Sequence, residues 1–365
     1  MMIYFVVFII SSFLCEQGFA KKKLSFFILT SLAVLIPAIL AGVRDVSIGT
    51  DRLVYGDELF YDVMNSQDLL HLDDIWTGWI EPGYIYLNVL VGKIYPSVNF
   101  FYFVLSLIQG VCVLTALKVL NVKKYAGFAY GAYLFLFFQP ALNLLRQSLA
   151  VSVSLLCVAF MIKNKKLLAG IAFFLAMSFH NSAIIILLIM VVVLVLSKIH
   201  SLQAYAIMSV SILGFLAWGG WFVDRFAPIL NIEASRYSDY FAVSEVTGFS
   251  NTEMVFALLQ GFFIFLNYKK FRGNSLTLNF FVFVSVASIP LSQVLMFGGD
   301  YVGRLIVLFN WLMIPMYAIV LRLSERKKTV LAGLSLYVLS FWFYHYIYLG
   351  WNQTYPYTSA ILGLD

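Results

Sequence analysis

The side chains best suited to chemistry in this chain are arginines that stand at the ends of long apolar runs. Arg146 is the clearest case, because apolar residues flank it on both sides in FFQPALNLLRQSLAVSVSLL. Arg44 and Arg304 also border apolar runs. An arginine offers a planar fork of donors that suits phosphate or carboxylate oxygens, and it stays charged where water is scarce. If the runs cross a membrane, an ionisable residue at that depth is a functional candidate.

Each arginine also has a structural interpretation. Arg146 would then snorkel to the membrane interface and pair with a carboxylate such as Glu81 or Asp300. Arg44 and Arg304 would form ion pairs between helices. The sequence leaves both interpretations open.

A histidine and several carboxylates lie near the same apolar runs. His180, in AMSFHNSAIII, is suited to proton transfer near neutral pH or to donating a hydrogen bond to a diphosphate. From its position alone, a hydrogen-bonded structural role is favoured. The acidic stretch 45–81 is interpreted mainly as a solvated face. Within it, Asp51 and Glu81 stand close to apolar runs and are the better candidates for a general base.

The composition requires a membrane. The chain is 62% hydrophobic and only 12% charged, whereas a soluble domain carries roughly 25% charged residues. The net charge of +6 comes from short basic clusters between apolar runs, a pattern typical of topology determinants and not of a nucleic-acid-binding surface. We therefore expect an all-α polytopic membrane protein, with the lipid bilayer as a partner and no nucleic acid.

Twelve apolar runs predict about 12 transmembrane helices in a single integral membrane domain, 1–365. The runs are at about 2–15, 24–41, 98–117, 125–142, 147–162, 167–179, 183–197, 203–219, 252–267, 276–297, 303–321 and 329–349. Two longer loops, at about 42–81 and 220–251, are expected on the outer face. The segment 82–95 is also apolar, but counting it as a span would place Lys118 to Lys124 outside. We expect it to be re-entrant or interfacial.

This arrangement separates the two kinds of cation. With the N-terminus outside, 14 of the 15 lysines fall on the cytoplasmic side. Six of the nine arginines and 16 of the 18 carboxylates fall on the outer side. Lysine alone satisfies the positive-inside rule, so the outer arginines need another explanation. We interpret the outer rim as the reactive one.

Four stretches carry a family resemblance. They are VRDVSIGTDRLVY, EPGYIYLNVLV, NLLRQSLAVSVSLL and FFLAMSFHNSAIIILL. In this order they resemble the EpsG-type membrane proteins of exopolysaccharide gene clusters, which belong with the Wzy-type polymerases of O-antigen and capsule. The resemblance covers roughly residues 40–190, and the second half is similar only in layout. It implies a fold like that of integral-membrane glycosyltransferases with lipid-linked donors, and no metal or other cofactor.

The resemblance also implies a function and a set of site residues. The chain would act at the outer face of the bacterial inner membrane, transferring a glycan from undecaprenyl diphosphate to the next lipid-linked repeat unit. A chain-length regulator protein is a further expected partner. Matching motifs carry over Arg44, Arg146 and His180, and with them Gly49 and Asp51. Gln147, Arg236 and Arg304 are added as candidates for binding the diphosphate or the glycan.

The resulting hypothesis is an inverting transfer without a metal. Arg146, with Arg44 or Arg304, would bind the donor diphosphate and stabilise its charge as the glycosyl bond breaks. His180 or a carboxylate (Asp51, Glu81 or Asp300) would deprotonate the acceptor hydroxyl.

Three other functions share parts of this pattern. A flippase or other transporter for lipid-linked oligosaccharides would place charges near mid-membrane between related halves, whereas here they crowd one rim. An O-antigen ligase shares the donor and the side. A sugar acyltransferase usually needs an intramembrane histidine, for which only His180 would serve.

Overall fold

The computed structural model describes residues 1–21, 23–65, 80–196, 198, 206, 209–210, 251–267, 276–294, 307 and 309–364. The chain divides into two compact units. Unit 1 comprises Met1–Met190, Ile314–Arg322 and Leu331–Asp365, and unit 2 comprises Val191–Met313 and Leu323–Val330. Each unit is described by itself, and a single integral membrane domain stays a prediction.

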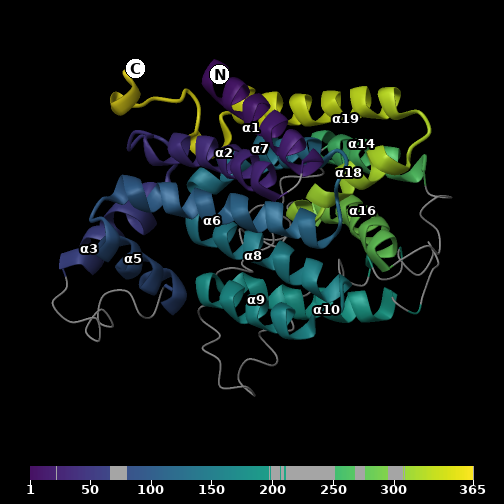
Figure 1. Ribbon diagram of the computed structural model, residues 1–365, viewed down its shortest axis with the longest axis horizontal. Coiled ribbons are helices and arrows are strands. Elements are labelled where there is room, and N and C mark those ends of the chain that lie inside the picture. The colour runs from purple at the N-terminus through teal and green to yellow at the C-terminus, as the bar shows by residue number, and fades with distance from the viewer. Residues whose placement is uncertain are drawn as a thin grey trace. The chain divides into compact units, whose positions relative to one another are not determined.

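Every regular element in the described ranges is a helix (Figure 1). The α-helices are α1 (Met2–Ala20), α2 (Lys23–Gly42), α3 (Leu59–Asn65), α5 (Pro82–Ile94), α6 (Val98–Val119), α7 (Ala126–Asn143), α8 (Leu145–Ile162), α9 (Lys166–Phe179), α10 (Ile185–Leu196), α14 (Asn251–Phe265), α16 (Leu276–Val294), α18 (Ile314–Leu323) and α19 (Lys327–Trp342). Shorter π or 3₁₀ helices are η1 (Arg52–Glu58), η2 (Asn181–Ile184), η3 (Phe343–Tyr348), η4 (Trp351–Gln353) and η5 (Ala360–Leu362). The all-α prediction is confirmed.

Five helices within the described residues are long and apolar enough to cross a bilayer. They are Met2–Ala20, Lys23–Gly42, Val98–Val119, Leu145–Ile162 and the continuous stretch Lys327–Tyr348. A span needs about 20 residues, so these helices support a multi-pass membrane protein. The count of 12 spans stays a prediction, since the run 203–219 lies almost entirely outside the described residues and 303–321 lies partly outside.

The helices of unit 1 form a bundle of mostly antiparallel neighbours, in which α6 and α8 run in the same direction. Helix α1 packs against α2 and α7, α2 against α6, α6 against α8, and α8 against α9. A Cβ placed on Gly42, at the end of α2, would lie 3.0 Å from the carbonyl oxygen of Asn99, at the start of α6. The chain between these helices therefore leaves and rejoins the bundle at one end. This supports the prediction that the segment 82–95 makes no net crossing of the membrane.

Helix α5 is the structural form of that segment. Its 13 residues begin with Pro82, whose fixed φ and missing N–H suit the first turn of a helix. At 1.5 Å per residue it is about 20 Å long, shorter than a hydrocarbon core of about 30 Å. Its re-entrant or interfacial placement stays a prediction.

The two ends of the bundle carry different charges. At the lysine end, the Glu16 carboxylate accepts from the backbone N–H groups of Tyr125 (3.1 Å) and Gly127 (2.8 Å) and so caps α7. The helix ends there carry Lys21, Lys23, Lys118, Lys123, Lys124, Lys163, Lys165 and Lys166. The opposite end, here the arginine end, carries Arg44, Arg52, Glu81, Arg146 and His180, with α3 and α5 beside it (Figure 1).

Part of the first outer loop is helical. Helices η1 and α3 occupy 52–65 and pack against α5, α6 and α8, because Leu59, Phe60 and Val63 are buried. This part of the loop is therefore packed through its apolar residues, while Glu58 is exposed and Asp51, Asp57 and Asp62 are partly exposed. The remainder of that loop, 66–79, and nearly all of the second, 220–251, lie outside the described residues.

The C-terminal tail folds back onto the arginine end. The backbone N–H of Asp45 donates to the carbonyl oxygen of Thr358 (3.1 Å), and the N–H of Ala360 donates to the Asp45 carboxylate (2.9 Å). The N–H of Gly49 donates to the carbonyl of Gln353 (3.1 Å). These bonds fix the segment 43–49 that connects α2 to the site.

Candidate functional site

Arg44 follows α2 by two residues and turns into the bundle. It is only 2% exposed, and its guanidinium carbon lies 4.5 Å from the centre of the Tyr102 ring. No described residue provides an acceptor for its Nε or Nη2. A buried charged donor left without an acceptor costs on the order of 1–3 kcal/mol or more. Burial lowers the pKa of Arg44 to about 10, so the side chain remains charged at neutral pH.

Arg44 also lines a small cavity. Ser106 and Gln109 of α6 line it too, among mostly apolar neighbours. About 10 Å³ is open there to the centre of a water-sized sphere, which is room for about one water molecule. The cavity is too small for a phosphate group.

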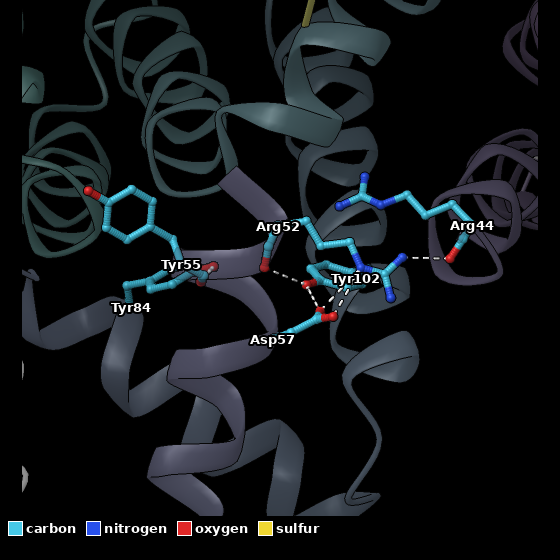
Figure 2. Close-up of polar contacts among 6 residues, drawn as sticks. All are labelled: Arg44, Arg52, Tyr55, Asp57, Tyr84 and Tyr102. Carbon is cyan, nitrogen blue, oxygen red and sulfur yellow. Dashed lines mark hydrogen bonds and ion pairs between the residues drawn. The ribbon is translucent and has the colours of Figure 1, made fainter. Parts of the chain in front are cut away.

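Arg52 and Asp57 occupy the π-helix η1, whose repeat brings residues five apart onto one side (Figure 2). The Arg52 Nε donates to Asp57 Oδ1 (3.2 Å) and Oδ2 (3.4 Å), and its Nη1 donates to the Arg44 carbonyl oxygen (2.6 Å). Its guanidinium carbon lies 4.8 Å from the Tyr102 ring centre. The Tyr102 hydroxyl donates to Asp57. We call Arg44, Arg52, Asp57 and Tyr102 the arginine cluster.

Arg146 belongs to a second centre. At the start of α8, its Nη1 donates to Glu81 Oε2 (2.5 Å), and the two side chains are 11% and 8% exposed. Glu81 Oε1 accepts from the backbone N–H of Asn181 (2.9 Å), next to His180. The structure thus brings three predicted residues together. It also pairs Arg146 with Glu81, one of the two carboxylates that the structural interpretation of Arg146 names.

Helix η1 connects the two centres. Its Tyr55 ring lies against Arg146, with the guanidinium carbon 4.4 Å from the ring centre. The carbonyl oxygen of Tyr55 accepts a hydrogen bond from the hydroxyl of Tyr84 in α5 (3.0 Å; Figure 2). A movement of this one short helix would therefore affect both arginine centres.

His180 lies where α9 ends and the chain becomes extended. Its Nδ1 accepts a hydrogen bond from the backbone N–H of Ser182 (3.1 Å), which caps η2, and the Ser182 hydroxyl lies 2.7 Å from the same nitrogen. A nitrogen that accepts from an N–H carries no proton, so the neutral ring holds its proton on Nε2. In this state Nε2 is a hydrogen-bond donor and not a base.

Asp51 is positioned by the end of α7. The Asn143 side-chain oxygen accepts from the Thr50 hydroxyl and from the Asp51 backbone N–H, both at 2.9 Å. The turn needs Gly49, whose φ is +88°, and a Cβ there would lie 2.9 Å from the Leu142 carbonyl oxygen. The backbone of 49–51 is thus fixed against α7.

The other predicted residues fall in two groups. Gln147 is buried on α8 beside Arg146. Asp300, Arg236 and Arg304 lie outside the described residues. No group of three or more His, Cys, Asp or Glu suited to a metal occurs in the described ranges, and metal-independent transfer stays a prediction.

Sequence reasoning did not select Arg52, Asp57 or Tyr102. The five-residue spacing of Arg52 and Asp57 in DRLVYGDE was the available signal, but it becomes meaningful only in a π-helix. Tyr102 stands in an apolar run, where nothing in the local sequence separates it from the surrounding aromatic residues.

The comparisons with known proteins give one match. The model of the EpsG family matches residues 27–359, which includes the half of the chain where our motif-based resemblance was weak. No curated protein and no solved structure matches the chain, so a likeness to integral-membrane glycosyltransferases with lipid-linked donors stays a prediction. The family match covers nearly the whole sequence, and the chain therefore belongs to the EpsG family, a family of Wzy-like polymerases.

Proposed function

We propose that this protein polymerises a surface polysaccharide, such as an O-antigen, a capsule or an exopolysaccharide. It transfers the growing glycan from undecaprenyl diphosphate to a lipid-linked repeat unit. The observation that carries the proposal is the gathering of buried arginines at one end of the helix bundle in a member of the EpsG family. The lysines at the opposite end support an arginine end that faces the outside of the inner membrane.

The chemistry is a displacement at the anomeric carbon of the donor. The acceptor hydroxyl oxygen forms the new glycosidic bond, and the bond to the diphosphate oxygen breaks with its electron pair. Arginine side chains stabilise the negative charge that develops on the leaving diphosphate. His180 donates from Nε2 to the same group, as its Ser182 contact at Nδ1 favours. A single displacement inverts the anomeric configuration.

The acceptor proton requires a carboxylate base. Glu81 is poorly placed as the base, because its two carboxylate oxygens already accept hydrogen bonds from Arg146 and from the Asn181 N–H. Asp51, at the start of η1, is our preferred base among the described residues. Asp300 remains the second candidate.

Reconstitution of the full-length chain in proteoliposomes with lipid-linked repeat units tests the proposal. We expect a ladder of lengthening glycans and release of undecaprenyl diphosphate without added nucleotide sugar. Lys93→Gln, on an exposed position of α5, serves as a charge-matched control and should give the same ladder. Passage of single units across the bilayer without elongation would indicate a flippase, and transfer to lipid A without a ladder would indicate a ligase.

A further inference from the structure

The arginine cluster holds more positive than negative charge. It contains two guanidinium groups and one carboxylate, and the two arginines are only 2% and 5% exposed. By contrast, Arg146 and Glu81 form a pair with no net charge. A buried cation without a matching anion is unfavourable, so the arginine cluster is the centre that gains more from an incoming anion.

The donors of the cluster suit an anion with several oxygens. Nε and Nη2 of Arg44 have no acceptor among the described residues, and the Arg44 side chain lines a small cavity. Arg52 already binds the two oxygens of Asp57 through its Nε. A carboxylate with two oxygens is a smaller analogue of a phosphate group in its contacts with arginine.

We infer that Arg44 and Arg52 together form a phosphate- or diphosphate-binding site, and that the Asp57 carboxylate occupies part of it in this structure. Asp57 is the component best placed to leave, since its side chain is 21% exposed while that of Arg52 is 6% exposed. Its departure would free the Arg52 Nε in the same cluster as the Arg44 donors that have no acceptor among the described residues. Asp57 therefore competes with the ligand.

The inference refines the proposed function and rests on it for the identity of the anion as a lipid diphosphate. It assigns the main diphosphate contact to Arg44 with Arg52. It gives Arg146 a positioning role through Glu81, Asn181 and Tyr55.

A binding experiment tests the inference without polymerisation. The full-length chain in lipid nanodiscs is titrated with farnesyl diphosphate and, separately, with inorganic pyrophosphate. Arg52→Gln and Arg44→Gln should each weaken binding about tenfold or more, because each removes charge-assisted hydrogen bonds. Asp57→Asn should change binding in the opposite direction and tighten it about fivefold, because the competing charge is gone. Tighter binding of the prenyl compound identifies a lipid headgroup as the source, and equal binding identifies a free anion.

Two controls keep the outcome interpretable. Lys93→Gln removes one charge at the same end of the bundle without contacting the cluster, and it should leave the dissociation constants unchanged. If Arg52→Gln does not fold, Arg52→Lys takes its place, because lysine keeps the positive charge. It should bind the probes more weakly than the wild type, since lysine lacks the planar fork of donors of arginine. Wild-type affinity in folded Arg44 and Arg52 variants, or weaker binding by Asp57→Asn, overturns the inference. If these binding changes appear but the wild type makes no polymer, the site stands and the proposed function fails.

Discussion

The side chain of Arg52 donates to the backbone carbonyl oxygen of Arg44 over 2.6 Å, and this bond holds two buried guanidinium groups in one cluster. Like charges in such a place repel each other, and Arg52 adds to the lowering of the Arg44 pKa that burial causes. The Tyr102 ring, which both guanidinium groups contact, and the Asp57 carboxylate offset part of this repulsion. The cluster therefore keeps two buried positive charges together at a cost in stability.

Tyr102 should stabilise the cluster mainly through its ring. A cation over an aromatic face contributes up to about 2 kcal/mol when water is excluded, and here two cations share one ring. We expect Tyr102→Leu to lower the thermal unfolding midpoint in detergent clearly more than Tyr102→Phe, which keeps the ring and loses the hydroxyl bonds to Asp57 and to the Arg52 carbonyl oxygen. Equal losses in the two variants would contradict a stabilising role for the ring.

A double substitution separates the two interpretations of Arg146. Removing one partner of a buried pair leaves an uncompensated charge and costs about 3–5 kcal/mol. Arg146→Gln and Glu81→Gln should therefore each destabilise the protein, and the double variant should recover part of the loss. The measurements are thermal unfolding and chain growth in proteoliposomes.

The activity of the double variant then decides between a positioning role and a purely structural role for Arg146. If Arg146 is needed for positioning at the site, the folded double variant stays at least about tenfold less active than the wild type, a loss of about 1.4 kcal/mol in transition-state stabilisation. If the pair is only structural, chain growth returns together with stability.

The tautomer of His180 predicts which replacement is tolerated. Because Nδ1 accepts from the Ser182 N–H, the useful group is the N–H at Nε2, and glutamine also offers an N–H at the end of its side chain. We expect His180→Gln to keep a substantial part of chain growth, and His180→Ala to lose about tenfold or more. If both variants lose activity equally, a proton-accepting role for His180 is favoured instead.

The sequence was sufficient for several of the long helices and for one of the two arginine centres. Apolar runs predicted α2, α6 and α7 to within about two residues at each end, because a long apolar segment in a bilayer can satisfy its backbone only as a helix. Glu81 was likewise among the partners considered for Arg146.

The arginine cluster could not be predicted in the same way. It depends on a π-helix inside a stretch interpreted as a solvated loop, and on a hydrogen bond between Tyr102 and Asp57 across 45 positions of the chain. Neither feature leaves a periodic pattern in the amino-acid sequence. The contact of the C-terminal tail with Asp45 depends on a still longer separation.

Gly49 should be a sensitive glycine near the site, because both its conformation and its surroundings exclude a side chain. Its φ of +88° is unfavourable for any other residue, and a Cβ would lie 2.9 Å from the backbone oxygen of Leu142. Backbone strain of this kind costs about 1–3 kcal/mol, and its relief would move Asp51 away from Asn143. We therefore expect Gly49→Ala to lower both the unfolding midpoint and the rate of chain growth.

Substitutions at Gly350 and Gly170 separate the effect of backbone strain from that of steric crowding. Gly350 has a φ of +65° but no atom within 4 Å of the added Cβ, so Gly350→Ala should destabilise the protein less than Gly49→Ala. Gly170 lies inside α9 with open space around it, and Gly170→Ala should stabilise the helix by about 0.5–1 kcal/mol. Thermal unfolding of the three variants in one detergent tests this order. If Gly49→Ala is as stable and active as the wild type, the turn at residue 49 does not position Asp51.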